Sequence, residues 1–206
     1  MVEDQQLLFI DFEFTMPEKN SYFKGFYPEI IEAGVVAVVS SEIRIQFSTF
    51  VTPLRFPILS KRCKAFLHIK QEQVDHGISF VELLKKLNEL NKGFYSKIVT
   101  WGNMDMRVLR KNCEMAKAEF PFSGEELDLS MEYKRFFGDQ NQTGLWKAVK
   151  EYGREGTGMH HRALDDALTT YKIFRLVEKD KSYLYNQKVT TIGDIVDMTK
   201  LLNKFA

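Results

Sequence analysis

The chain has 206 residues, of which 44% are hydrophobic and 28% are charged, and this suits one globular domain with a sizeable core. Its 29 Lys and Arg residues nearly balance its 28 Asp and Glu residues, so the net charge of +1 excludes a protein that binds nucleic acid through a globally basic surface. Any basic footprint must be local. The chain shows no internal repeat and no low-complexity tract.

The first residues and the two cysteines bear on the cellular compartment. The N-terminus is acidic and leads into a short apolar run that Asp11 interrupts, which fits neither a signal peptide nor a membrane-spanning helix. Cys63 and Cys113 lie 50 positions apart without CxxC spacing, so we expect two reduced thiols. We therefore expect a cytoplasmic protein with no membrane attachment.

Three β-strands are expected early in the chain. Leu7–Ile10 is a continuous apolar run that ends in Asp11, a pattern typical of a central strand buried on both faces. Residues 30–39 form a second β-rich run, and residues 43–51 alternate well enough to be its hairpin partner. The pattern predicts three adjacent antiparallel strands.

The middle of the chain favours helix, strand and helix. We expect the stretch between Pro53 and Ser79 to be irregular, after which Ser79 heads a helix whose apolar residues recur at helical spacing up to Gly93. Residues 98–101 favour a fourth strand, and Asn103 can cap the helix that follows it. An acidic residue, Asp105, thus lies where a strand passes into a helix.

The remainder of the chain is expected to contain a short strand at 127–129, then helical segments near 130–137 and 143–152, a glycine-rich loop at 153–158 and a helix from about 162 to 178. A further amphipathic helix is marked by Ile195, Met198, Leu201, Leu202 and Phe205. We expect an α/β domain over residues 1–180 and, packed on the same domain, a C-terminal helical extension over residues 181–206.

Two of the acidic residues lie two positions apart at the end of the first strand. On an extended chain Asp11 and Glu13 point to the same face, so this pair can share a metal ion. Asp105 follows the fourth strand, and Asp166 lies one turn inside the helix after the glycine-rich loop. We expect these four carboxylates to be catalytic and to hold metal ions.

Phosphodiester hydrolysis is the chemistry that suits such a set of carboxylates. Two divalent ions about 4 Å apart can stabilise the attacking and the leaving oxygen of an in-line displacement. Hard oxygen ligands select Mg²⁺, for which Mn²⁺ can substitute, over Zn²⁺, and no Cys/His cluster in the sequence offers a thiolate or imidazole cage. We therefore expect two Mg²⁺ ions as the cofactor.

A general base for the attacking water is expected at two neighbouring histidines, because the pKa of histidine lies near neutrality. His161 precedes Asp166 by five residues and follows a glycine-rich stretch that lets the backbone bring the imidazole over the site. The pair His160 and Asp165 has the same spacing. The residues alone leave both pairs open.

Several blocks between residues 7 and 178 resemble one known family. They are Leu8–Thr15, Glu29–Gly34, the Leu67–Phe80 stretch, Thr100–Asp105 and His161–Ala167. Together they resemble the DEDDh exonucleases of the RNase H-like superfamily, a resemblance that implies a mixed five-stranded sheet with flanking helices, two Mg²⁺ ions and stepwise 3′-to-5′ release of nucleoside monophosphates. The resemblance also implies His161 as general base and Asp166 as metal ligand. It favours single-stranded RNA over DNA as the substrate.

Alternatives stay open for residues beyond these five. Phe14, Thr15 and Met16 follow the acidic pair and are expected to bind the terminal nucleotide, although core packing explains them equally well. Glu32 could complete a metal site or face solvent, and Trp101 suits a buried anchor better than a stacking platform. Basic residues that could guide phosphates, or could simply be solvated, are Lys61, Arg62, Lys64, Lys70, Arg107, Arg110 and Lys111.

Two rival functions keep the same fold. One is a regulatory module, an inhibitor of a sporulation kinase pathway, that binds a protein partner through the cleft or the C-terminal helix. The other is a proofreading subunit of a polymerase assembly. The presence of all four acids and of His161 favours the enzyme over the binding module. A proofreading subunit would instead be distinguished by co-purification with a polymerase.

Overall fold

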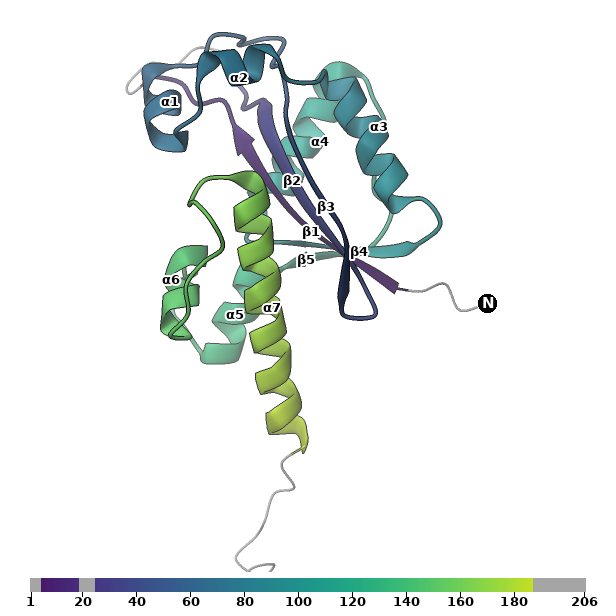
Figure 1. Ribbon diagram of the computed structural model, residues 1–206, viewed down its shortest axis with the longest axis vertical. Coiled ribbons are helices and arrows are strands. Elements are labelled where there is room, and N and C mark those ends of the chain that lie inside the picture. Colours follow the sequence, from purple (N-terminus) through teal and green to yellow (C-terminus); the bar gives the residue numbers. More distant parts are fainter. Residues whose placement is uncertain (1–4, 19–24, 187–206) are drawn as a thin grey trace, which may run out of the picture. The chain divides into compact units, whose positions relative to one another are not determined.

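The computed structural model describes residues 5–18 and 25–186 (Figure 1). Within these residues, five strands form one sheet in the order β3-β2-β1-β4-β5. The strands are β1 (Gln5–Phe14), β2 (Ile30–Val39), β3 (Glu42–Phe50), β4 (Tyr95–Thr100) and β5 (Glu126–Asp128). The first three pair antiparallel, whereas β4 runs parallel to β1 and β5 runs parallel to β4. The expected mixed sheet and its early antiparallel strands are confirmed.

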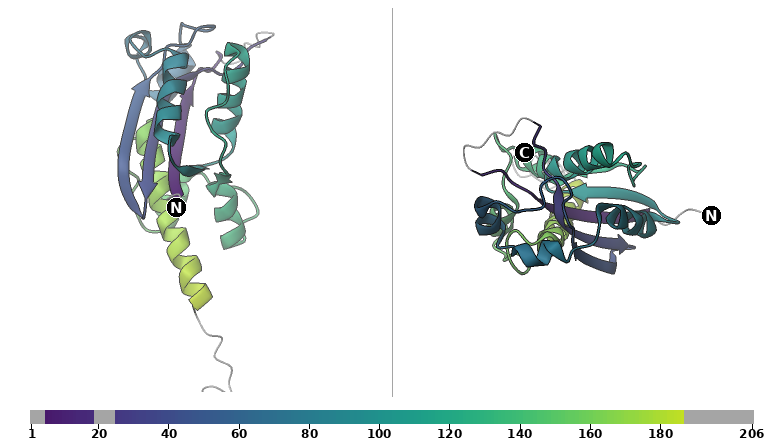
Figure 2. Two further views of the ribbon diagram at one scale, coloured as in Figure 1. Left: turned by 90° about the vertical axis from the view of Figure 1, so that its right-hand side faces the viewer. Right: turned by 90° about the horizontal axis from the view of Figure 1, so that it is seen from above.

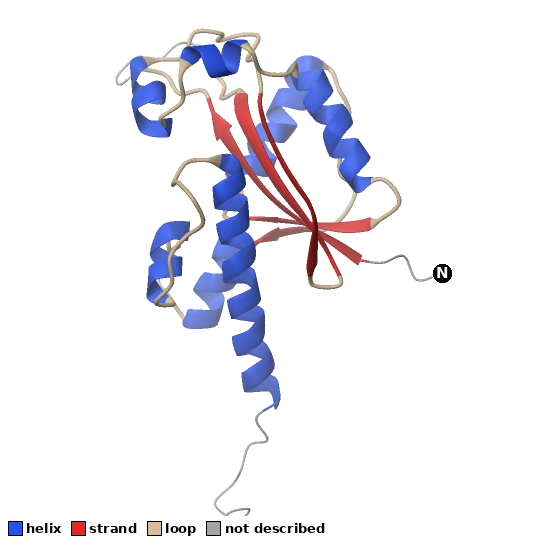
Figure 3. Ribbon diagram, viewed as in Figure 1, coloured by secondary structure: helices blue, strands red, loops and turns tan. Residues whose placement is uncertain are grey.

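Helices flank this sheet (Figure 3). Over the same described residues they are α1 (Lys61–Leu67), α2 (Gln71–Asp75), α3 (Phe80–Asn91), α4 (Met104–Ala116), α5 (Leu129–Phe137), α6 (Leu145–Glu151) and α7 (Ala163–Asn186). Ser79 caps α3 as expected, because its side chain accepts a hydrogen bond from the backbone N–H of Glu82. Asn103 occupies the corresponding position of α4, but its side chain makes no capping hydrogen bond, so that part of the expectation was wrong.

The stretch between β3 and α3 was expected to be irregular, and here the expectation was wrong. It contains α1 and α2, which have only seven and five residues, too few to show a helical repeat of apolar positions. Cys63 of α1 and Val74 of α2 instead pack with Ile31 of β2 in a small apolar cluster of their own. Helix α1 contributes Arg62, Phe66 and Leu67 to one wall of the cavity described below.

The alternation of side chains along β1 decides which face of the sheet carries acidic residues. Leu8, Ile10 and Phe12 belong to the main core with residues of α3 and α4. On the opposite face, the ring of Phe9 contacts the rings of Tyr171 and Phe174 in α7 at 5.1 and 5.3 Å. The left view of Figure 2 shows α3 in front of the strands and the first turns of α7 behind them. Asp11 and Glu13 alternate with the core residues and therefore lie on the α7 face.

The first turn of α7 approaches β2 very closely at Gly34. Gly34 pairs with Asp11 across the β1–β2 ladder, and a Cβ atom on it would lie 2.1 Å from the carbonyl carbon of Ala163. Only glycine leaves room for a backbone at this distance. The contact fixes the start of α7 directly over the acidic end of β1.

The chain divides into two compact units, Met1–Phe174 and Arg175–Ala206, with the boundary inside α7. The described part of the second unit is the end of α7, up to Asn186. The helix expected around residues 195–205 lies outside the described residues. Among the helices that are described, none combines the length and the apolar character needed to cross a bilayer.

Substituting Gly34 should destabilise the protein because the clash is with backbone, which cannot rotate away. We expect Gly34→Ala to lower the free energy of unfolding by at least about 1–3 kcal/mol, measured by denaturant titration. Gly144→Ala is the matched control, since no atom lies within 4 Å of a Cβ built there. Equal stabilities for the two variants would contradict the close approach of α7 to β2.

Candidate active site

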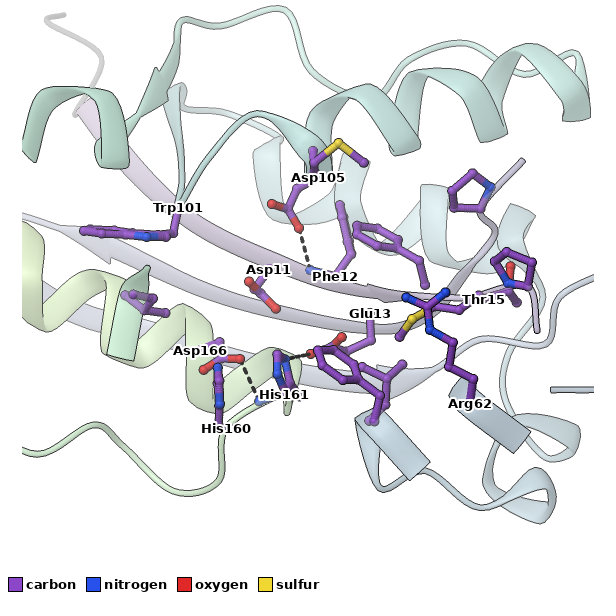
Figure 4. A pocket seen from close by; sticks show the side chains of 18 of the residues that line it. Asp11, Phe12, Glu13, Thr15, Arg62, Trp101, Asp105, His160, His161 and Asp166 are labelled. Atoms are coloured by element: carbon purple, nitrogen blue, oxygen red, sulfur yellow. Dashed lines mark hydrogen bonds and ion pairs between the residues drawn. The ribbon is translucent and has the colours of Figure 1, made fainter. Parts of the chain in front are cut away.

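A cavity of about 470 Å³ lies where the acidic end of β1 meets the first turns of α4 and α7 (Figure 4). Ligand sites in open α/β sheets lie at the carboxyl ends of strands, and this cavity occupies such a position. Its lining includes all the residues that the sequence assigned to the site, namely Asp11, Glu13, Phe14, Thr15, Met16, Asp105, His161 and Asp166.

Three of the four expected carboxylates converge closely. One oxygen from each of Asp11, Glu13 and Asp166 lies within 4.8 Å of the other two. Asp11 and Glu13 come from the same face of β1, as expected, and Asp166 comes from the first turn of α7. Residues more than 150 positions apart thus present oxygens to a common point.

Asp105 lines the same cavity from the start of α4 but lies outside that tight group. Its Oδ1 accepts a hydrogen bond of 2.9 Å from the backbone N–H of Phe12, the residue between Asp11 and Glu13. The side chain is buried, with only 6% of its surface exposed. This bond ties the helix start to the acidic end of β1.

The structure separates the two neighbouring aspartates of α7. Asp165 turns toward the glycine-rich loop, where its Oδ2 accepts a hydrogen bond of 2.8 Å from the N–H of Met159. Asp166 faces the cavity and is held at both oxygens, since Oδ1 accepts from Trp146 Nε1 at 2.6 Å and Oδ2 from the N–H of His161 at 3.0 Å. The sequence left open which of the two aspartates belongs to the site, and in the structure Asp166 is the one that lines the cavity.

His161 lies over the acidic group between two other rings. Its Nδ1 is 4.0 Å from Oε1 of Glu13. The imidazole stacks on His160 at a centroid distance of 3.7 Å and contacts Phe66 of α1 at 4.3 Å. Burial lowers the pKa of His161, and the neighbouring His160 and His68 lower it further.

Burial and mutual repulsion dominate the electrostatics of the carboxylates. Burial, followed by repulsion from neighbouring acids, raises the pKa of Glu13 to about 8. Burial raises the pKa of Asp105 to about 7, and it raises that of Asp11 well above the ordinary value. It also raises the pKa of Asp166. Buried carboxylates that repel one another and offer only oxygen donors fit hard divalent cations, which would relieve the repulsion.

Glu32 and Trp101, for which the sequence allowed two roles each, differ in their position relative to the cavity. Glu32 is buried and is not part of the cavity lining; its Oε1 accepts a hydrogen bond of 2.8 Å from Arg162 Nη2. Trp101 is half-buried and lines the cavity, and its Nε1 donates to the carbonyl of Thr143 at 3.0 Å, so it is held in place without being the fully buried residue that was expected.

Two aromatic residues of the cavity were missed at the sequence level. Trp146 orients Asp166, and Phe66 contacts His161. Trp146 lies in the seven-residue helix α6, whose sequence carries no signal that connects it with an acid 20 positions away. Among the basic residues considered, Arg62 lines the cavity, whereas Arg110 pairs with Glu126 and Lys111 with Glu114.

A family model described as Exonuclease matches residues 8–174 of the chain. The chain belongs to the exonuclease family. It is 57% identical over 198 residues to the probable 3′-5′ exonuclease KapD of Bacillus subtilis (strain 168), a match that covers 96% of this chain and 97% of KapD. It is 29% identical over 192 residues to human 3′-5′ exoribonuclease 1, which covers 87% of this chain and 54% of the human protein. The chain thus spans about half the length of that relative.

Solved structures of nucleases share the fold. The nuclease domain of 3′hExo, a DEDDh family member, was solved bound to rAMP and superposes with a TM-score of 0.77 at 29% identity, covering 87% of this chain and 94% of that one. This member of the exonuclease family therefore has the expected RNase H-like fold of the DEDDh enzymes. It is a 3′-5′ exonuclease that acts on nucleic acid.

The raised pKa values predict how stability depends on pH in this exonuclease. The pKa of Glu13 rises from 4.5 to about 8, so between these values the folded protein binds more protons than the unfolded chain. The free energy of unfolding therefore falls as pH rises through this window. In the presence of a chelator, we expect the melting temperature to decrease from about pH 5 to about pH 8.

The same measurement on Glu13→Gln isolates the contribution of this carboxyl. The variant should show a shallower decrease, because the amide neither titrates nor repels Asp11 and Asp166. A melting temperature that rises over this range in both proteins would contradict the assigned crowding of carboxylates.

Proposed function

We propose that the enzyme removes nucleotides one at a time from single-stranded 3′ ends and releases nucleoside monophosphates, with RNA favoured over DNA. The observation that carries the proposal is the convergence of Asp11, Glu13, Asp105, Asp166 and His161 on one cavity. A nucleic-acid end, rather than an internal segment, suits this cavity because its volume of about 470 Å³ matches that of small-ligand sites.

The carboxylates of Asp11, Glu13, Asp105 and Asp166 would hold two Mg²⁺ ions, for which Mn²⁺ can substitute. When bound, such ions stabilise charge on the attacking and leaving oxygens of the phosphodiester. The hydrogen bonds from Trp146 and from the N–H of His161 fix Asp166, and the N–H of Phe12 fixes Asp105. These partners orient the carboxylates before any ligand arrives.

His161 is proposed as the general base that accepts a proton from the attacking water. Its lowered pKa keeps the imidazole neutral, and so able to accept a proton, at neutral pH. With 27% of its side chain exposed, the ring is reachable from the cavity and from solvent, so the proton can leave afterwards. Phe66 contacts the imidazole and restricts its rotation.

Phe14, Thr15 and Met16 are proposed to receive the terminal nucleotide. All three line the cavity directly after the acidic pair. Thr15 Oγ1 accepts a hydrogen bond of 2.9 Å from the N–H of Glu29, and the hydroxyl can still donate to a sugar oxygen. The apolar groups of Phe14 and Met16 suit the face of a base or sugar. That 3′hExo was solved with rAMP, and that human relatives are named exoribonucleases, supports RNA.

The test measures the stepwise shortening of 5′-labelled RNA and DNA of one sequence in Mg²⁺ on a gel. The products of a 3′-phosphorylated substrate are resolved beside them for comparison. We expect single-nucleotide steps from the free 3′ end, faster on RNA. Asp11→Asn should abolish them, because one of the central carboxylates is lost. A chain that shortens neither substrate would favour the regulatory binding module instead.

Variants of the two histidines test the base. His161→Ala should lower the rate by about 10²- to 10⁴-fold, the usual contribution of a general base, whereas His160→Gln should leave the rate in Mg²⁺ close to that of the unmodified enzyme. If His160→Gln were the crippling change and His161→Ala were mild, the assignment of the base would be wrong by one residue.

A further inference from the structure

The adjacent histidines of the loop before α7 share an unusual backbone arrangement. His161 has a φ of +63°, in the left-handed region that residues with a Cβ rarely adopt. In an extended chain, successive side chains point to opposite sides. Here the rings of His160 and His161 lie face to face, 3.7 Å apart and inclined by only 20°.

This arrangement brings two imidazoles beside a carboxylate. One nitrogen from each of His160 and His161 and one oxygen of Asp166 lie within 4.8 Å of one another. Sequence spacing does not predict an imidazole cluster here, because the side chains of two consecutive residues normally point in different directions. Of the three side chains, His160 is exposed. An ion can therefore reach it from solvent, and its ring has room to rotate.

The carboxylate of this group is already oriented. Trp146 Nε1 and the N–H of His161 each donate to one oxygen of Asp166. A carboxylate has about four lone-pair positions, so each oxygen can still bind a cation. Neighbouring donors in a tetrahedral Zn²⁺ shell lie about 3.3 Å apart, a spacing that small side-chain rotations can reach from the observed positions.

We propose that His160, His161 and Asp166 form a second cation site, selective for borderline transition-metal ions such as Zn²⁺, with water completing the shell. Two imidazole nitrogens and one carboxylate oxygen suit Zn²⁺, whereas Mg²⁺ prefers oxygen donors alone. The site is therefore chemically distinct from the all-oxygen group of Asp11, Glu13 and Asp166, although the two share one aspartate.

The shared residues give the second site a consequence for catalysis, and this step rests on the proposed function. An ion at the second site engages Asp166 and also occupies a nitrogen of His161, the proposed base. Zn²⁺ should therefore inhibit hydrolysis that is fully supported by Mg²⁺. The inhibition requires His160, which contributes a ligand but has no part in the proposed reaction.

The experiment measures Zn²⁺ binding to the full chain by calorimetry in excess Mg²⁺, and inhibition by Zn²⁺ under the same conditions. The unmodified protein should bind one Zn²⁺ and lose activity as it binds. His160→Gln should weaken Zn²⁺ binding on the order of 10- to 100-fold or more and raise the inhibitory Zn²⁺ concentration by the same factor, with inhibition expressed relative to each protein's own rate in Mg²⁺ alone.

His76→Gln is the matched control, because His76 is exposed on the chain directly after α2 and belongs to neither group of potential ligands. It should bind Zn²⁺ as the unmodified protein does. Equal Zn²⁺ affinity in the unmodified protein and in His160→Gln overturns the proposal, as does an equal loss in both variants. Calorimetry requires no turnover, so an inactive protein would refute the proposed function without obscuring this result.

Discussion

The site depends on one constraint: carboxylates that repel one another are held together by the packing of the elements that carry them. β1 supplies Asp11 and Glu13, and the approach of Ala163 to Gly34 places the start of α7 over them. The raised pKa of Glu13, about 8, shows how strongly burial and neighbouring acids disfavour the charged form. The apolar core on the other face of the sheet stabilises this arrangement, and a bound cation would favour it further.

Hydrogen bonds convert this crowding into a defined geometry. The N–H of Phe12 binds Asp105, and Trp146 binds Asp166, so each acid outside β1 has a donor that fixes its direction. The aromatic contact between His161 and Phe66 does the same for the proposed base. Helices α1 and α6 carry no acid of the site, but they supply Phe66 and Trp146, which contact His161 and Asp166.

Most of the fold and the acidic residues could be predicted from sequence, because these features follow local patterns. Apolar runs located β1, β2 and β4, and the spacing of Asp11 and Glu13 placed both on one face. The helices α1 and α2 are too short for a periodic signal, and the bond between Trp146 and Asp166 joins residues without any local relation. Spacing could not decide which of Asp165 and Asp166 faces the cavity. That depends on the backbone of the loop before α7, in which His161 has a left-handed conformation.

The most direct test is anomalous diffraction from crystals of the full chain grown with Mn²⁺. We expect two strong peaks within ligand distance of the carboxylates of Asp11, Glu13, Asp105 and Asp166, and their loss in Asp11→Asn. Mn²⁺ peaks elsewhere, with none among these four side chains, would contradict the claim that the convergent carboxylates form a divalent-cation site.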